Sequence, residues 1–216
     1  MLKRLFGRKR FKPSLRNLRL EVDGLKPESG HKGVRVWRTD AGDAVGMFYF
    51  NSPPDLPSGH DTDKEFLSAY CSSVQAQGVT VVELDICDIG NLQALKSIVK
   101  VPQEPTGMTY VGAFILPFRE HSFVIKIQAE ERGITGMREA ILLDAAISEG
   151  KVRVAADGAI EGDWNPEDRC HDEAFPDHPL SRVRSWLPRI RSNLTFDANL
   201  ESVSKFEWPG ESAAKR

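Results

Sequence analysis

The sequence predicts an α+β fold in which helices pack against an antiparallel sheet. Segments that alternate like strands follow one another through short turns, and segments of helical period bracket them. Of the 216 residues, 40% are hydrophobic and 28% are charged, which is enough apolar surface for a buried core and unlike a disordered chain. The expected order is strands, helix, four strands and helix, with a C-terminal extension.

Three strands are expected before residue 60, over 18–22, 33–39 and 44–50. The segment 51–60, "NSPPDLPSGH", contains three prolines and is expected to be a loop. These strands therefore end where the first helix can begin.

The first helix is expected over 61–78. Thr62 and Glu65 have the spacing of a capping box, and Gly78 can end the helix. The apolar residues of this segment recur on one helical face, which we expect to be buried: Phe66, Leu67, Tyr70, Cys71 and Val74.

Four strands are expected next, over 79–86, 92–101, 108–116 and 122–130, joined as an antiparallel meander. The last two form the most apolar part of the chain, but Arg119, Glu120 and His121 lie between them, which excludes a membrane span and indicates a turn. Alternation predicts that Phe123, Ile125 and Ile127 face the core. The alternative is a ligand pocket lined by Tyr110, Phe114 and Phe118.

Two further helices are expected. The first, over 135–150, should bury Met137, Ile141 and Ala145, with Leu142 beside them. The second, over 178–194, should begin at an Asp177 N-cap, carry an apolar stripe, and be kinked or split by Pro188. The stripe consists of Leu180, Val183, Leu187, Ile190 and Leu194.

The run "FLSAYCSSVQAQGVTVVELDICDIGNLQALKSIVKVPQEPTGMTYVGAFILPFREHSFVIKIQAEERGITGMREAIL" resembles the PsbP-like α/β/α sandwich in its order of elements. The family includes bacterial secretion-chaperone and immunity-type proteins. The resemblance extends over about residues 18–150, implies a binding or adaptor protein, and transfers no functional residue. We therefore expect a basic tail over 1–16, a core over 17–150, and an extension over 151–216 packed on the core.

The segment 157–177 is strongly acidic. It contains Asp157, Glu161, Asp163, Glu167, Asp168, Asp172, Glu173 and Asp177, against the single cation Arg169. We predict that this face steers a basic protein partner. The predicted partner-binding residues are Glu167, Asp168, Asp172 and Glu173, with Arg182 and Arg184 of the next helix. There are two alternatives for the acidic segment: it is a solvated loop, or it holds the basic tail of the same chain.

The basic tail has no acid in sixteen residues: its cations are Lys3, Arg4, Arg8, Lys9, Arg10, Lys12 and Arg16. It could touch a membrane surface weakly, contact nucleic acid, or cross the acidic segment of its own chain or of a second copy in a homodimer. The net charge of −2 gives no strong nucleic-acid signal.

Known catalytic motifs are absent from the sequence: there is no GxSxG, P-loop or HExxH. We therefore predict no catalytic residue, no metal and no cofactor. The three cysteines form no CxxC pair, which favours a reducing, cytoplasmic location.

The predicted function is a non-enzymatic adaptor, such as an immunity protein or an effector chaperone that binds a basic toxin or secreted effector. The alternative is a metal-dependent enzyme or small-molecule-binding protein that uses Cys170, His171 and His178.

Overall fold

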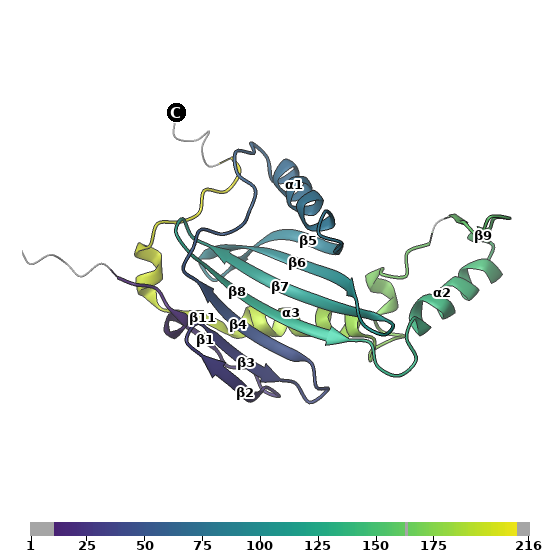
Figure 1. Ribbon diagram of the computed structural model, residues 1–216, viewed down its shortest axis with the longest axis horizontal. Helices are drawn as coiled ribbons and strands as arrows, with labels where there is room; N and C mark the ends of the chain where they lie inside the picture. Colours follow the sequence, from purple (N-terminus) through teal and green to yellow (C-terminus); the bar gives the residue numbers. More distant parts are fainter. Residues whose placement is uncertain (1–10, 163, 211–216) are drawn as a thin grey trace, which may run out of the picture.

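The computed structural model describes residues 11–162 and 164–210. At its centre lies an open, seven-stranded antiparallel sheet in the order β2–β3–β4–β8–β7–β6–β5 (Figure 1). The strands are β2 (Lys26–His31), β3 (Val34–Arg38), β4 (Ala44–Phe50), β5 (Thr80–Ile89), β6 (Leu92–Pro102), β7 (Met108–Pro117) and β8 (Ser122–Glu130). The predicted α+β class and the meander β5–β8 are confirmed.

The N-terminal strands differ from the prediction. β1 (Leu18–Leu20) lies outside the main sheet and pairs with β11 (Leu194–Phe196), so its partner is remote in the sequence. β2 was not predicted, because Pro27 and Gly30 weaken its strand pattern. As an edge strand, β2 tolerates both residues.

One face of the sheet carries the main core. Phe123, Ile125 and Ile127 are 0% exposed, as predicted. Tyr110, Phe114 and Phe118 are each 1% exposed within the same core, so the alternative of a pocket lined by these residues is wrong. The apolar hairpin is therefore sheet core.

Helix α3 (Pro179–Asn193) covers this face across β7 and β8. Gly112 permits the close approach, since a Cβ there would lie 2.5 Å from Val183 Cγ1 and 3.0 Å from Leu187 Cδ1. Pro188 does not split the helix, which runs unbroken from Pro179 to Asn193 with Pro188 on its exposed side. The N-cap is His178 rather than Asp177, and its Nδ1 accepts from Leu180 N.

The other face is covered in part by α1 (Asp63–Gln75), which packs against β5 and is drawn above that strand in Figure 1. The Thr62–Glu65 capping box is present as predicted. Phe66 is 1% exposed and forms a second apolar cluster with Leu95 and Trp208.

Helix α2 (Met137–Ser148) and the hairpin of β9 (Val152–Val154) and β10 (Ile160–Gly162) project away from the sheet (Figure 1). The predicted burial of α2 is wrong: Met137 is 45% exposed, Ile141 is 49% exposed, and Ala145 is exposed as well. The residues that α2 buries are Arg138 and Ala146. The predicted helical period of the apolar residues is correct, but no face of the sheet packs against them.

Three short 3-10 helices complete the described chain: η1 (Leu15–Asn17), η2 (Arg169–His171) and η3 (Ala198–Ser202). Within the described residues, no helix is long and apolar enough to cross a membrane. Most of the predicted basic tail, residues 1–10, lies outside the described residues.

Candidate functional site: an apolar arm and the cavity at its base

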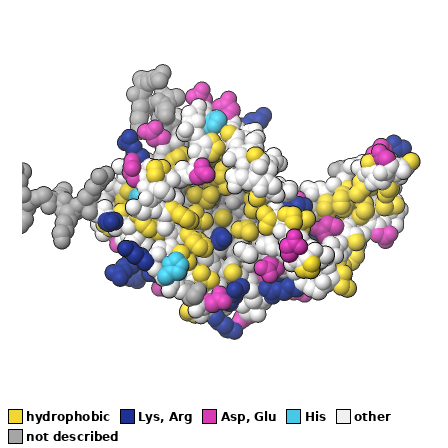
Figure 2. Space-filling view, in the orientation of Figure 1, with side chains coloured by type: hydrophobic (Ala, Val, Ile, Leu, Met, Phe, Trp, Pro, Cys, Tyr) yellow, Lys and Arg dark blue, Asp and Glu magenta, His cyan; other side chains and the backbone are white. Residues whose placement is uncertain are grey.

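Residues 134–162, which we call the arm, carry an uncovered apolar surface. Seven large hydrophobic side chains are exposed in the described part of the chain, and six of them lie on the arm. They are Ile134 (74% exposed), Met137, Ile141, Ile147, Val154 and Ile160. Figure 2 shows hydrophobic side chains along the projecting arm. Apolar side chains gathered in this way mark interaction surfaces more often than the scattered ones found on any protein.

The arm is anchored by a buried arginine. Arg138 is 2% exposed, and its guanidinium donates to the carbonyls of Pro166 (2.8 Å) and Asp168 (3.0 Å). It also donates to Asp172 Oδ1 (3.1 Å) and Ser181 Oγ (3.0 Å). A buried cation needs this complete set of acceptors. Turning Arg138 inward directs the apolar side chains of α2 outward.

The same ionic network reaches the sheet through Arg184. Its Nη1 donates to Asp172 Oδ1 at 2.9 Å, and its Nε donates to Glu83 Oε1 at 2.6 Å. Burial alone would raise the pKa of Glu83, but hydrogen bonds from Lys96 and Arg184 lower it to about 2. Asp172 thus joins α2, α3 and β5 through two arginines.

The six predicted partner-binding residues do not form one surface. Asp172 and Arg184 belong to the internal network, and Arg182 pairs with the fully buried side chain of Asp43 at 2.9 Å. Glu167 is half-buried and forms an ion pair with Lys100. Asp168 is exposed and accepts from Cys170 N, while Glu173 is exposed. The acidic segment is held by cations of α2, α3 and β6, and Asp168 and Glu173 are left facing solvent.

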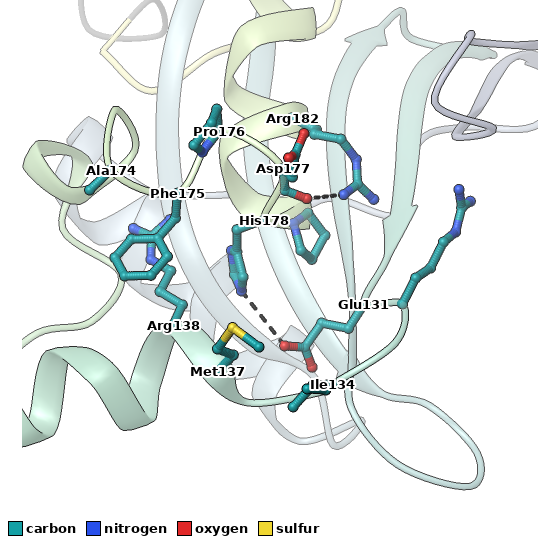
Figure 3. A pocket seen from close by; sticks show the side chains of 12 residues that line it. Glu131, Ile134, Met137, Arg138, Ala174, Phe175, Pro176, Asp177, His178 and Arg182 are labelled. Carbon is teal, nitrogen blue, oxygen red and sulfur yellow. Dashed lines mark hydrogen bonds and ion pairs between the residues drawn. The ribbon is translucent and has the colours of Figure 1, made fainter.

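A cavity of about 440 Å³ opens where the arm leaves the sheet (Figure 3). Ile134 and Met137 line its arm side, and Phe175 and His178 line the side of the 164–178 segment. Glu131 lies at its floor, at the end of β8. The cavity is therefore continuous with the apolar surface of the arm.

Glu131 and His178 line this cavity, and Glu139 lies beside them, with one donor atom from each of the three within 4.8 Å of the others. His178 Nε2 is 3.7 Å from Glu131 Oε1 and 3.8 Å from Glu139 Oε1. Glu131 is fixed by backbone groups, since its Oε1 accepts from Gly136 N (3.0 Å) and its Oε2 from Met108 N (2.8 Å). It ties the end of β8 to the start of α2.

The imidazole of His178 is kept neutral. Burial, together with the nearby cations Arg138 and Arg182, lowers its pKa to about 4. The side chain is 7% exposed, and Nε2 has no hydrogen-bond partner among the described residues. A buried polar atom without a partner requires an explanation.

The metal or small-molecule alternative from the sequence combined His178 with Cys170 and His171. In the described chain, however, the residues that meet His178 are Glu131 and Glu139, while Cys170 is exposed on η2. No spacing in the sequence points to the two glutamates, because only the chain path from β8 through α2 to α3 brings them to His178.

No family model and no curated protein matches this sequence. Among solved structures, a protein from Bacteroides thetaiotaomicron VPI-5482 is similar over 72% of this chain, with 9% sequence identity and a TM-score of 0.35. The match spans 48% of that chain, so the present chain corresponds to about half of its length. A likeness at this level carries no argument about fold or function, and the resemblance to the PsbP-like family stays a prediction.

Proposed function

We propose that this chain is a non-enzymatic protein-binding module whose contact surface is the arm. The observation that carries the proposal is the concentration of six of the seven exposed large hydrophobic side chains of the described residues on residues 134–160. Burying such side chains contributes about 25 cal/mol per Å² of apolar surface removed from water. A partner that covers the arm gains this stabilisation, which the arm does not obtain from its own sheet.

The charges beside the arm favour a basic partner. Asp144, Glu173 and Asp177 are exposed, and none has a cation within ion-pair distance among residues 11–162 and 164–210. On the β9–β10 hairpin, by contrast, Arg153 pairs with Glu161. An apolar centre with an acidic rim fits a partner surface with an apolar centre and a basic rim.

The ordering of the arm supports the same role. Four hydrogen bonds from Arg138 hold α2 in place, so little conformational entropy is lost when a partner binds. An immunity protein or an effector chaperone, the two roles predicted from the sequence, would each require a prepared surface of this kind.

Site-specific crosslinking tests the proposal. A photo-crosslinking amino acid is placed at Ile141 on the arm and, as a matched control, at Phe50, the remaining exposed large hydrophobic residue. In extract of the source cells, we expect position 141, and not position 50, to give one discrete adduct with a different, basic protein.

The crosslinked protein is then purified and its affinity for the full chain measured. Ile141→Ser and Ile134→Ser should each raise Kd at least about tenfold, as truncation of central contact residues does, while Phe50→Ser should not change it. Equal affinities for the three variants would refute the arm as the contact surface. An adduct between two copies of this chain would replace the basic partner with a homodimer.

A further inference from the structure

We propose that Glu131, Glu139 and His178 form a binding site for a divalent transition-metal ion of the zinc type. The inference is separate from partner binding, and it rests on a cluster of three side chains, of which Glu131 and His178 line the cavity where the arm joins the sheet. Two carboxylates and one imidazole are donors that zinc accepts in proteins, and a catalytic-type or regulatory site needs only three protein ligands.

The spacing of the donor atoms is the first support. His178 Nε2 lies 3.7 Å and 3.8 Å from the two carboxylate oxygens, which is too long for a hydrogen bond. Ligands bound about 2.1 Å from a tetrahedral ion lie about 3.4 Å from one another. Small side-chain movements would therefore bring all three atoms to one ion.

The second support is that the site contains polar atoms without partners. His178 Nε2 and Glu139 Oε2 are buried and have no hydrogen-bond partner among the described residues. The His178 side chain is 7% exposed, so bulk water does not compensate Nε2 fully. A shared cation would satisfy the imidazole and both carboxylates at once.

The surroundings orient the ligands. Both oxygens of Glu131 accept backbone N–H groups, which fixes the carboxylate and leaves each oxygen a second lone pair for an ion. Two of the three ligands, Glu131 and His178, line the cavity of about 440 Å³, from which an ion could reach them.

Metal binding should cost the protein one hydrogen bond to His178, and the change of protonation that accompanies this loss can be detected. Leu180 N donates to His178 Nδ1 at 3.3 Å, so the neutral ring carries its proton on Nε2. When Nε2 binds an ion, that proton leaves Nε2 and Nδ1 becomes protonated, so the long bond from Leu180 N is lost. A change of tautomer at His178, visible in the ¹⁵N shifts of the ring, should therefore accompany binding.

The experiment is a calorimetric titration of the full, chelator-treated chain with ZnCl₂ in a non-chelating buffer, followed by thermal unfolding. We expect one ion per chain and a higher Tm with zinc. Glu139→Gln and His178→Gln should each weaken binding at least about 100-fold, more than the loss of an outer-shell group does. Glu139→Gln is the cleaner variant, since Glu139 Oε2 has no hydrogen bond to lose among the described residues.

The matched control is Cys170→Ser with His171→Gln, which removes the cysteine and the other histidine of the same segment. Zinc binding should be unchanged in this control. Absence of stoichiometric binding, equal binding in wild type and Glu139→Gln, or loss of binding in the control would each overturn the assignment. Binding of Mg²⁺ or Ca²⁺ with no response to zinc would overturn the metal class.

Discussion

Helices α2 and α3 both have an apolar face, yet they use it in opposite ways. Helix α3 lays Leu180, Val183 and Ile190, each 0% exposed, on the sheet. Helix α2 exposes Met137 and Ile141 by 45% and 49% and buries Arg138 instead. The difference shows that helical period defines a face but does not decide whether the fold covers it.

The largest effect should come from the anchor of α2. Arg138→Leu leaves Asp172 with Arg184 alone as a cation among the described residues, and it leaves two backbone carbonyls without their donor. We expect a loss of about 3–5 kcal/mol in the free energy of unfolding, the usual cost of breaking a buried ion pair from one side. Urea denaturation followed by circular dichroism measures it.

A loss below about 1 kcal/mol for Arg138→Leu would mean that the buried network is no stronger than a surface ion pair. The matched control is Arg153→Leu, whose ion pair with Glu161 lies on the exposed hairpin. We expect this control to be close to neutral.

A second pair of substitutions compares the two helices directly. Leu187→Ala in α3 removes a side chain that is 2% exposed and should destabilise the protein by about 2–5 kcal/mol. Ile141→Ala in α2 removes a side chain that is 49% exposed and should change stability by no more than about 0.5 kcal/mol. If the two variants lost similar stability, α2 would be packed on the core and the arm would not be a free surface.

Acid should weaken the network that holds both helices. The folded pKa of Glu83, about 2, lies below its usual value of 4.5, so folding favours the ionised carboxylate. This contribution is complete above about pH 4.5 and is lost as the pH falls towards 2, by about 3 kcal/mol at most. The free energy of unfolding, measured across this range, should fall less steeply in Glu83→Gln than in wild type.

An unchanged slope in Glu83→Gln would show that other carboxylates cause the acid sensitivity.

His178 affects stability over a different pH range. Its folded pKa of about 4 lies below the usual 6.5, so its contribution to the free energy of unfolding is lost as the pH falls from 6.5 to 4. The two groups are therefore separable by pH.

Sequence patterns predicted those features of the fold that depend on residues close together in the chain. The capping box at Thr62 and Glu65, the alternation of Phe123, Ile125 and Ile127, and the stripe of α3 depend on neighbours in the sequence, and the structure has them. The pairing of β1 with β11 and the meeting of Glu131, Glu139 and His178 depend on long-range contacts that no spacing encodes.

The burial of Arg138 illustrates the limit best. Arginine in an amphipathic helix is expected to face water, and acceptors far along the chain, on Pro166, Asp168, Asp172 and Ser181, make its burial possible. The same is true of Asp172 and Arg184, which were predicted as surface residues for a partner and lie in that network.

The smallest effect on stability should come from substituting the acids that lie outside the network of Arg138, Asp172 and Arg184. These substitutions are also the most informative about partner binding. Glu173 and Asp177 are exposed, so reversing both to lysine should change the free energy of unfolding by no more than about 0.5 kcal/mol. Association with a basic partner should nevertheless slow, because steering depends on the exposed field rather than on packing. Stopped-flow association of the crosslinked partner at several salt concentrations measures this, since exposed charges are screened over about 8 Å at physiological ionic strength.

The control for this reversal is Asp172→Asn, which alters a half-buried acid of the same segment. Because Asp172 accepts from both Arg138 and Arg184, this variant should lose stability and leave the salt dependence of association unchanged. If the Glu173 and Asp177 reversal slowed association equally at low and high salt, the acids would act by direct contact and not by steering. If it destabilised the protein as much as Asp172→Asn does, these two acids would belong to the clamp that holds α2 and α3, and the acidic rim would have no role in choosing a partner.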